Sequence, residues 1–238
     1  MGIIKWLGES ENWKVPECEG HAHFVMPLVE RWVLDVANLE GSVRKLALQA
    51  GLNCTSRLAL RTALASTDLN PRWSPWEWHG SSVIKAPASA ANLGVRFLET
   101  NEYIKYLEVL APDLARFGII EAFVDGPQYE VDGYVLGGDI SCFCCLFQHW
   151  NSAFDRILAY ERKEPPFAGW REAVVTAVKR VGIDDCPFCV EMRYDLRLNQ
   201  WKVIEIHARL GEDPGLPELM SDDYPLMVIE QACLSHIR

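Results

Sequence analysis

The stretch Val203-Ile204-Glu205-Ile206-His207-Ala208-Arg209-Leu210-Gly211 alternates apolar and polar side chains with a period of two. That period is typical of a β-strand with one buried face. Ile204, Ile206 and Ala208 fall on one face, whereas Glu205, His207 and Arg209 fall on the other. A carboxylate, an imidazole and a guanidinium in one row indicate a site for a metal ion and an anionic group.

A second alternating segment, Phe188 to Asp195, comes shortly before and places Glu191 on its polar face. The residues Arg197-Leu198-Asn199-Gln200 form a polar turn, so the two segments are expected to pair as a β-hairpin. If the connecting loop has an odd residue count, Glu191 and Glu205 share a face. One such strand alone fits a solvated polar face. The pair favours a metal site, because two adjacent carboxylates repel unless a cation such as Mg²⁺ or Mn²⁺ lies between them.

The composition bounds the class of protein. The chain has 238 residues, enough for one large domain or two small lobes, and 49% of them are hydrophobic. Its net charge of −10 argues against a sequence-independent nucleic-acid binder. No apolar run reaches membrane-spanning length, and the start lacks the core of a signal peptide. We therefore expect a cytoplasmic protein without a nucleic-acid or membrane partner.

Eight cysteines raise the question of a structural zinc ion. The C-x-x-C pair of Cys186 and Cys189 could combine with Cys142 and Cys144 into a four-thiolate site. However, Cys142 and Cys144 lie in an apolar, strand-like run without the spacing of a zinc knuckle. Reduced and mostly buried thiols are the favoured interpretation.

The order of expected elements mixes helices with hairpins. Ser42 can cap a helix that ends at Gly51. Further helices are expected over 27–37, 100–112, 167–181 and the tail from Gly215; strands are expected over 82–87, 95–98, 118–124, 128–136 and 140–147. This order predicts an α+β protein with antiparallel sheets in two lobes.

Lys85 closes one of these strands, and the run of small residues Ala88 to Gly94 follows it. Small residues let backbone N–H groups approach a phosphate, and the lysine can supply charge. An ordinary hairpin with an exposed lysine is the alternative.

Taken in order, these parts resemble the ATP-grasp superfamily over about residues 42–238. The strand–lysine–small-residue loop comes first, Ile120 to Pro127 resembles the hinge between lobes, and Val203 to Gly211 resembles the metal-binding strand. The resemblance implies an N-terminal extension (1–40), an N-terminal lobe (41–117) and a C-terminal lobe (118–238), with the nucleotide site between the lobes. Family members generally carry a separate α/β domain before this region, and only about forty residues precede it here.

The resemblance also implies roles for single residues. Lys85 would contact the ATP phosphates, and a loop containing Ser89, Asn92 and Gly94 would close over them. The adenine and ribose would meet Glu121, the backbones of Ala122 and Val124, and Gln128. Arg44 or Lys45 would replace a further family lysine.

On the metal side, Glu191 and Glu205 would hold magnesium or manganese. His207 stands where the family usually has an asparagine ligand, and imidazole suits manganese, zinc or no direct contact with the metal better than magnesium. Arg209 would stabilise charge on the transferred phosphoryl group.

The function implied is an ATP-dependent carboxylate–amine ligase that forms an amide through an acyl phosphate. Its substrates would be a small-molecule or short-peptide acid and amine. One alternative is a degenerate nucleotide-binding module, or a subunit that works only with a partner; a kinase of the same superfamily is a third. A homodimer would supply substrate-binding surface that the short N-terminus does not.

Overall fold

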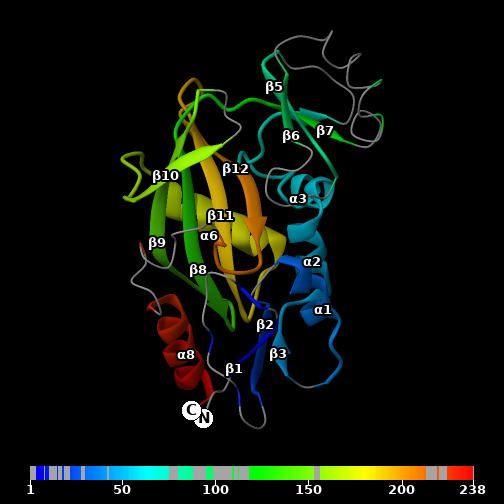
Figure 1. Cartoon of the computed structure of the whole chain (residues 1–238), viewed down its shortest axis with the longest axis vertical. Helices are drawn as coiled ribbons and strands as arrows, with labels where there is room; N and C mark the ends of the chain where they lie inside the picture. Colours follow the sequence, from blue (N-terminus) through cyan, green and yellow to red (C-terminus); the bar gives the residue numbers. More distant parts are fainter. Residues whose placement is uncertain are drawn as a thin grey trace.

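The protein is known from a computed structural model, which describes residues 4–7, 9–10, 15, 18, 22–27, 30–41, 43–74, 80–87, 95–98, 109, 112, 118–152, 156–212, 219 and 224–237. These residues form a large antiparallel sheet, a smaller antiparallel sheet beside its end, and a short parallel sheet near both chain termini (Figure 1). The predicted α+β class with antiparallel sheets in two lobes is confirmed. The parallel sheet was not predicted.

The large sheet has the strand order β10-β9-β8-β11-β12, and all its pairs are antiparallel. Its strands are β8 (Gln128–Leu136), β9 (Asp139–Trp150), β10 (Ile157–Arg162), β11 (Cys186–Asp195) and β12 (Gln200–His207). Both predicted hairpins are therefore present. The β8–β9 turn uses Gly137 and Gly138 at φ of 56° and 84°, a conformation that glycine adopts without steric cost.

Helix α6 (Trp170–Val181) covers one face of this sheet (Figure 1). Its side chains that were expected to face inward, including Trp170, Val174 and Val178, are buried. They pack with Val190 and Met192 of β11 in the main core. Burying this apolar face stabilises the sheet, and strand alternation places Glu191 on the opposite face from Val190 and Met192.

The smaller sheet has the order β4-β7-β5-β6. Its strands are β4 (Trp73–Ser74), β5 (Ser82–Lys85), β6 (Val95–Leu98) and β7 (Ile119–Ala122). The chain passes from β7 to β8 through Gly126, which lies so close to the backbone of Tyr194 that a β-carbon would collide with its carbonyl oxygen. This close approach explains why glycine follows Asp125 at the junction of the lobes. The helix expected over 100–112 falls almost entirely outside the described residues.

Two helices link the sheets, and they correct one prediction. The first, α2, spans Leu48–Thr55, so it begins six residues after Ser42 and contains Gly51 instead of ending there. A β-carbon on Gly51 would lie 3.3 Å from that of Ala37, so close packing against helix α1 (Val33–Asn38) explains the glycine. The second, α3, spans Arg57–Ala63 and is capped by Ser56, whose hydroxyl accepts from the Ala59 amide at 3.3 Å.

The parallel sheet consists of β1 (Ile4–Leu7), β2 (Phe24–Pro27) and β3 (Arg44–Lys45) in that order. Between β2 and β3 lie a 3₁₀ turn, η1 (Glu30–Trp32), and helix α1 (Val33–Asn38). The helix expected over 27–37 thus begins later, because its first residue belongs to β2. The C-terminal helix α8 (Tyr224–Ile237) packs Leu226, Ile229 and Cys233 with buried residues of β1, β2, β8 and β9. Among the described residues, no helix is long and apolar enough to cross a membrane.

Candidate active site

The two carboxylates singled out in the sequence face each other across β11 and β12. Glu191 and Glu205 are direct partners in the strand register, whereas Met192 pairs with Val203. Ile204 is therefore an extra residue on β12, a β-bulge. A regular hairpin would have placed Ile204 opposite Glu191, so the bulge turns Glu205 to the same face. It also corrects the prediction for Ile204, which lines a cavity while Ile206 and Ala208 are in the core.

His207 completes a cluster with this pair. One oxygen of each carboxylate and one ring nitrogen all lie within 4.8 Å of one another. Arg57, at the start of α3, forms an ion pair with Glu205, and Gln128 donates a hydrogen bond of 2.8 Å to Glu191. Two carboxylates and an imidazole are donors that fit a divalent cation.

Lys85 belongs to a buried ion network in the smaller sheet. Its ammonium lies 2.8 Å from Glu121, whose other oxygen lies 2.6 Å from Arg61. Burial would raise the pKa of Glu121, but Arg61 and Lys85 together lower it to about 2. Burial lowers the pKa of Lys85 to about 8, and repulsion from Arg57 and Arg61 acts in the same direction against the attraction of Glu121. This wall of the site therefore carries a surplus of positive charge.

A cavity of about 400 Å³ lies between the two lobes, and side chains of both the carboxylate pair and the Lys85–Glu121 ion pair line it. Its polar lining consists of Arg57, Lys85, Arg96, Glu121, Gln128, Glu191, Arg193 and Glu205. Its apolar lining includes Val83, Val95, Phe97, Phe123, Trp150 and Ile204. The rings of Phe97 and Phe123 meet edge to face at 5.1 Å. The cavity thus combines aromatic side chains, which can contact a flat ring, with charged groups of both signs.

The hinge residues have defined partners. Gln128 accepts a hydrogen bond of 2.6 Å from Arg193, so it links Arg193 to Glu191. Arg193 also donates to the carbonyl of Val124 at 3.2 Å, and its guanidinium lies 5.0 Å from the ring centre of Phe123. The amide of Ala122 donates to a carbonyl of the segment before β4 at 2.8 Å. Arg193 thus forms a side wall of the cavity, a role that was not predicted from the sequence.

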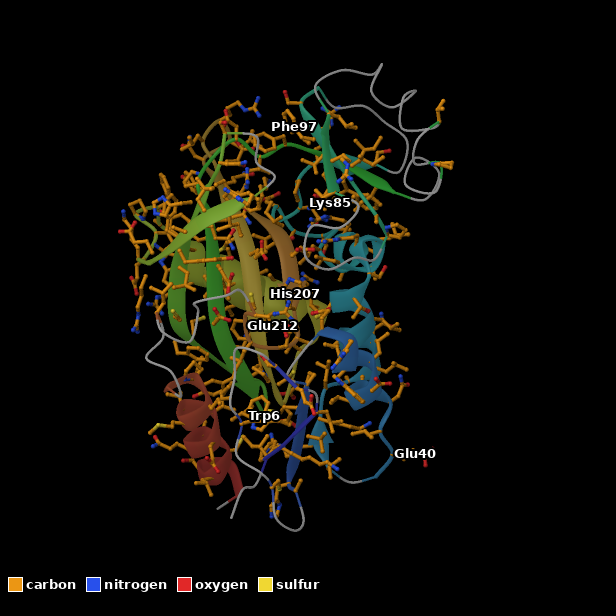
Figure 2. The ribbon with its side chains drawn as sticks, viewed as in Figure 1. Trp6, Glu40, Lys85, Phe97, His207 and Glu212 are labelled. Carbon is orange, nitrogen blue, oxygen red and sulfur yellow. The ribbon has the colours of Figure 1, made fainter. Side chains whose placement is uncertain are left out.

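Arg209 lies beside the carboxylate cluster and contacts two acids. Its Nε is 3.1 Å from Glu30 and 3.1 Å from Glu212. Glu30 comes from η1 and also lies 3.0 Å from Nδ1 of His207. Figure 2 shows His207 and Glu212 together at the centre of the molecule, with Lys85 toward the smaller sheet. The N-terminal part of the chain therefore contributes a residue to this site.

Comparison with known proteins identifies the architecture. No protein family model and no curated protein matches this sequence. Solved structures match its fold, among them an L-amino acid ligase from Bacillus licheniformis, with a TM-score of 0.65 and 22% identity over 84% of this chain and 51% of that one. A D-alanine–D-alanine ligase from Bacillus anthracis matches with a TM-score of 0.64 and 13% identity over 90% of this chain and 81% of that one. A protein from Archaeoglobus fulgidus assigned to the ATP-grasp superfamily matches with a TM-score of 0.59 and 18% identity over 79% of this chain and 58% of that one.

The chain has the ATP-grasp fold. It spans about half the length of the L-amino acid ligase. At these identities the likeness establishes the fold and leaves the reaction to be argued from the site.

Within this ATP-grasp fold, most of the predicted site residues come together. Lys85, Glu121, Gln128, Glu191 and Glu205 all line the cavity between the lobes, as do Ala122 and Val124. His207 adjoins Glu191 and Glu205, and Arg209 reaches His207 through Glu30. Ser89, Asn92 and Gly94 lie outside the described residues.

Arg44 and Lys45 do not belong to the site. Arg44 forms an ion pair with Asp185, and Lys45 donates to the backbone carbonyls of Ala37 and Leu39. Two arginines four residues apart on α3 were missed: Arg57 lines the cavity, and Arg61 contacts Glu121 behind it. Their i, i+4 spacing after the capping residue Ser56 was the signal in the sequence that could have found them.

The suggested zinc site is not formed. Cys186 and Cys189 are three residues apart on one strand, so their side chains point to opposite faces of the sheet. Cys186 donates instead to the carbonyl of Ala208 at 3.1 Å. Cys189 lies on the polar face, where it adjoins Glu130 and Asp132.

Proposed function

We propose that this chain is an ATP-dependent carboxylate–amine ligase, with ATP bound in the cavity between the lobes. The observation that carries the proposal is the lining of this cavity. Aromatic side chains (Phe97, Phe123 and Trp150) line it together with Lys85, Arg57 and the Glu191–Glu205 pair. A nucleotide needs both kinds of group, because it has a flat base and a chain of phosphates that requires cations.

In this proposal the base lies in the slot beside Phe97 and Phe123, and its edge is read by the carbonyl of Ala122 and the amide of Val124. Lys85 contacts the phosphates. Glu121 positions Lys85 and does not approach the adenine amino group. The reason is that Lys85 and Arg61 each contact one of the two carboxylate oxygens of Glu121.

Gln128 would lie near the ribose and couple it to the metal ligand Glu191, to which it donates. The segment with Ser89, Asn92 and Gly94 would close over the phosphates.

Glu191, Glu205 and His207 would hold one or more divalent cations, magnesium or manganese, which neutralise phosphate charge. The donors fit, because their ligand atoms lie within 4.8 Å of one another on one face of a rigid sheet. In the chemistry, an oxygen of the substrate carboxylate bonds to the γ-phosphorus while the bond to the bridging oxygen of ADP breaks. The amine nitrogen then bonds to the acyl carbon, phosphate leaves, and the amine loses a proton. Lys85, Arg57 and Arg209 stabilise the anionic charge in these steps.

A second candidate function is a nucleotide-binding module that does not turn ATP over. The ion pair between Arg57 and Glu205 favours it, since an arginine that neutralises a metal-binding carboxylate competes with the cation. Phosphates would draw Arg57 away in an active ligase, and in a binding module the ion pair would persist.

The test is ADP release in the presence of carboxylate and amine pairs, with Mg²⁺ and with Mn²⁺. Wild type should release ADP only when both an acid and an amine are supplied. Glu205→Gln should abolish release; glutamine is preferred to alanine because it keeps a polar partner beside the buried Arg57. Glu161→Gln on β10, an exposed acid, is the control and should keep wild-type activity. ATP binding without ADP release for any pair would favour the binding module, and full activity of Glu205→Gln would refute the site.

A further inference from the structure

His207 connects the N-terminal part of the chain with the carboxylate pair. Its Nδ1 lies 3.0 Å from the Glu30 carboxylate, at hydrogen-bond distance. Its Nε2 points the other way, 3.7 Å from Glu205 and 3.9 Å from Glu191. The ring therefore stands between a carboxylate on η1 and two carboxylates on the hairpin.

The hydrogen bond to Glu30 fixes the orientation of this ring. A carboxylate accepts, so Nδ1 donates to Glu30 and Nε2 is the ring atom available to a metal ion. Nε2 faces Glu191 and Glu205 at distances too long for a hydrogen bond. One ring nitrogen and two carboxylate oxygens around one point suit a cation of the size of a divalent metal. A carboxylate that orients a histidine in this way is the usual support of a histidine–metal bond.

Glu30 is itself held in place for this task. It accepts from Arg209 at 3.1 Å with the same oxygen that contacts His207. The Arg209 guanidinium thus holds the Glu30 carboxylate at the position where it accepts the imidazole proton.

We propose that Glu30 is a positioning residue that makes His207 a metal ligand, and that the resulting Glu191–Glu205–His207 site prefers Mn²⁺ to Mg²⁺. The preference follows from ligand chemistry. Mg²⁺ takes oxygen ligands almost exclusively, whereas imidazole nitrogen binds first-row transition ions well. The inference deepens the metal part of the proposed function and rests on that part.

The test uses each metal alone, without nucleotide. Calorimetry with Mn²⁺ and with Mg²⁺ gives the two affinities, and pulsed electron paramagnetic resonance of bound Mn²⁺ detects ¹⁴N coupling from a coordinated imidazole. Wild type should bind Mn²⁺ at least tenfold more tightly than Mg²⁺ and show the ¹⁴N coupling. His207→Asn should lose the coupling and most of the preference.

The variants of Glu30 separate positioning from charge. Removal of a supporting carboxylate typically costs 10- to 100-fold in metal affinity. Glu30→Ala should lose that much for Mn²⁺ and less than about threefold for Mg²⁺, and Glu30→Gln, which can still accept at its amide oxygen, should lose less. Glu212→Gln is the matched control, because Glu212 contacts the same Nε of Arg209 at the same distance as Glu30 does; it should change both affinities less than threefold. Thermal unfolding of each variant checks the fold, and Glu30→Gln stands in if the alanine variant does not fold.

Three outcomes would overturn the proposal: no binding of Mn²⁺, no ¹⁴N coupling in wild type, or a parallel loss of both metals in the Glu30 variants. A parallel loss would mean that Glu30 acts through its charge alone. These readouts are independent of the proposed ligase activity. ADP release with Mg²⁺ but no ¹⁴N coupling would refute this inference only, whereas ¹⁴N coupling without ADP release would refute the ligase.

Discussion

Arg61 is the side chain whose removal should damage the fold most without touching a proposed metal ligand. It lies where both lobes meet and has no exposed surface. Its guanidinium donates to Glu121 at 2.6 Å and to the carbonyls of Val203 and Ile204 at 2.8 Å each. Arg61→Met keeps much of the side-chain volume and removes every one of these donors.

The magnitude follows from the charge that remains. Removing one partner of a buried ion pair costs about 3–5 kcal/mol, because the other charge stays buried. The pKa of Glu121 gives the stabilisation of its carboxylate in a second way. A fall from 4.5 to about 2 corresponds to roughly 3 kcal/mol, which Arg61 and Lys85 supply together. Lys85 stays in the variant, while two strand carbonyls lose a donor worth about 1 kcal/mol each. We expect a loss of about 3–4 kcal/mol, a large part of the 5–15 kcal/mol that is typical of a folded domain.

The assay is urea unfolding at pH 7, followed by circular dichroism and by tryptophan fluorescence. Arg180→Met, which removes an exposed arginine on α6, is the control and should change the free energy of unfolding by less than about 0.5 kcal/mol. A loss below about 1 kcal/mol for Arg61→Met would refute the reasoning, since it would mean that the buried network does not stabilise the junction of the lobes.

Three further predictions concern the cavity. Because the cationic form of Lys85 binds phosphate and its pKa is about 8, ATP affinity measured by calorimetry should fall as pH rises through 8, and Lys85→Arg should remove this dependence. Because the folded-state pKa of Glu121 lies below its unfolded value, its contribution to stability is complete above pH 4.5 and is lost as pH falls toward 2; Glu121→Gln should flatten the profile of unfolding free energy in this window. Because Phe97 lines the proposed base slot, Phe97→Ala should weaken ATP binding by about 1–3 kcal/mol and leave tripolyphosphate binding unchanged; an equal loss for both ligands would argue against the slot.

Local pattern was enough to predict much of the fold. Alternation of apolar and polar side chains predicted the hairpins of the large sheet, and helical spacing predicted α6. The same alternation predicted that Glu191 and Glu205 share a face, on the condition of an odd loop count. In the structure the two carboxylates share a face because of the β-bulge at Ile204, and no residue in the sequence indicates that bulge.

Contacts between distant segments could not be predicted in this way. Arg61 and Glu121 are 60 residues apart, and Glu30 and His207 are 177 apart. Each of these side chains alone has the character of an ordinary surface charge, and only the fold brings the partners together. The parallel sheet was missed because its strands have only four, four and two residues, too few to show a period. The roles of Ser89, Asn92 and Gly94 remain predictions.

The central claim, a nucleotide site between the lobes, is tested most directly by calorimetry of ATP binding with Mg²⁺ and then with Mn²⁺, on wild type and on Lys85→Ala. Lys179→Ala, which removes an exposed lysine of α6 outside the cavity lining, controls for the loss of one lysine charge. The account predicts metal-dependent binding in the micromolar range that is lost in Lys85→Ala and retained in Lys179→Ala. Absence of binding with either metal, or equal binding by Lys85→Ala, would contradict it.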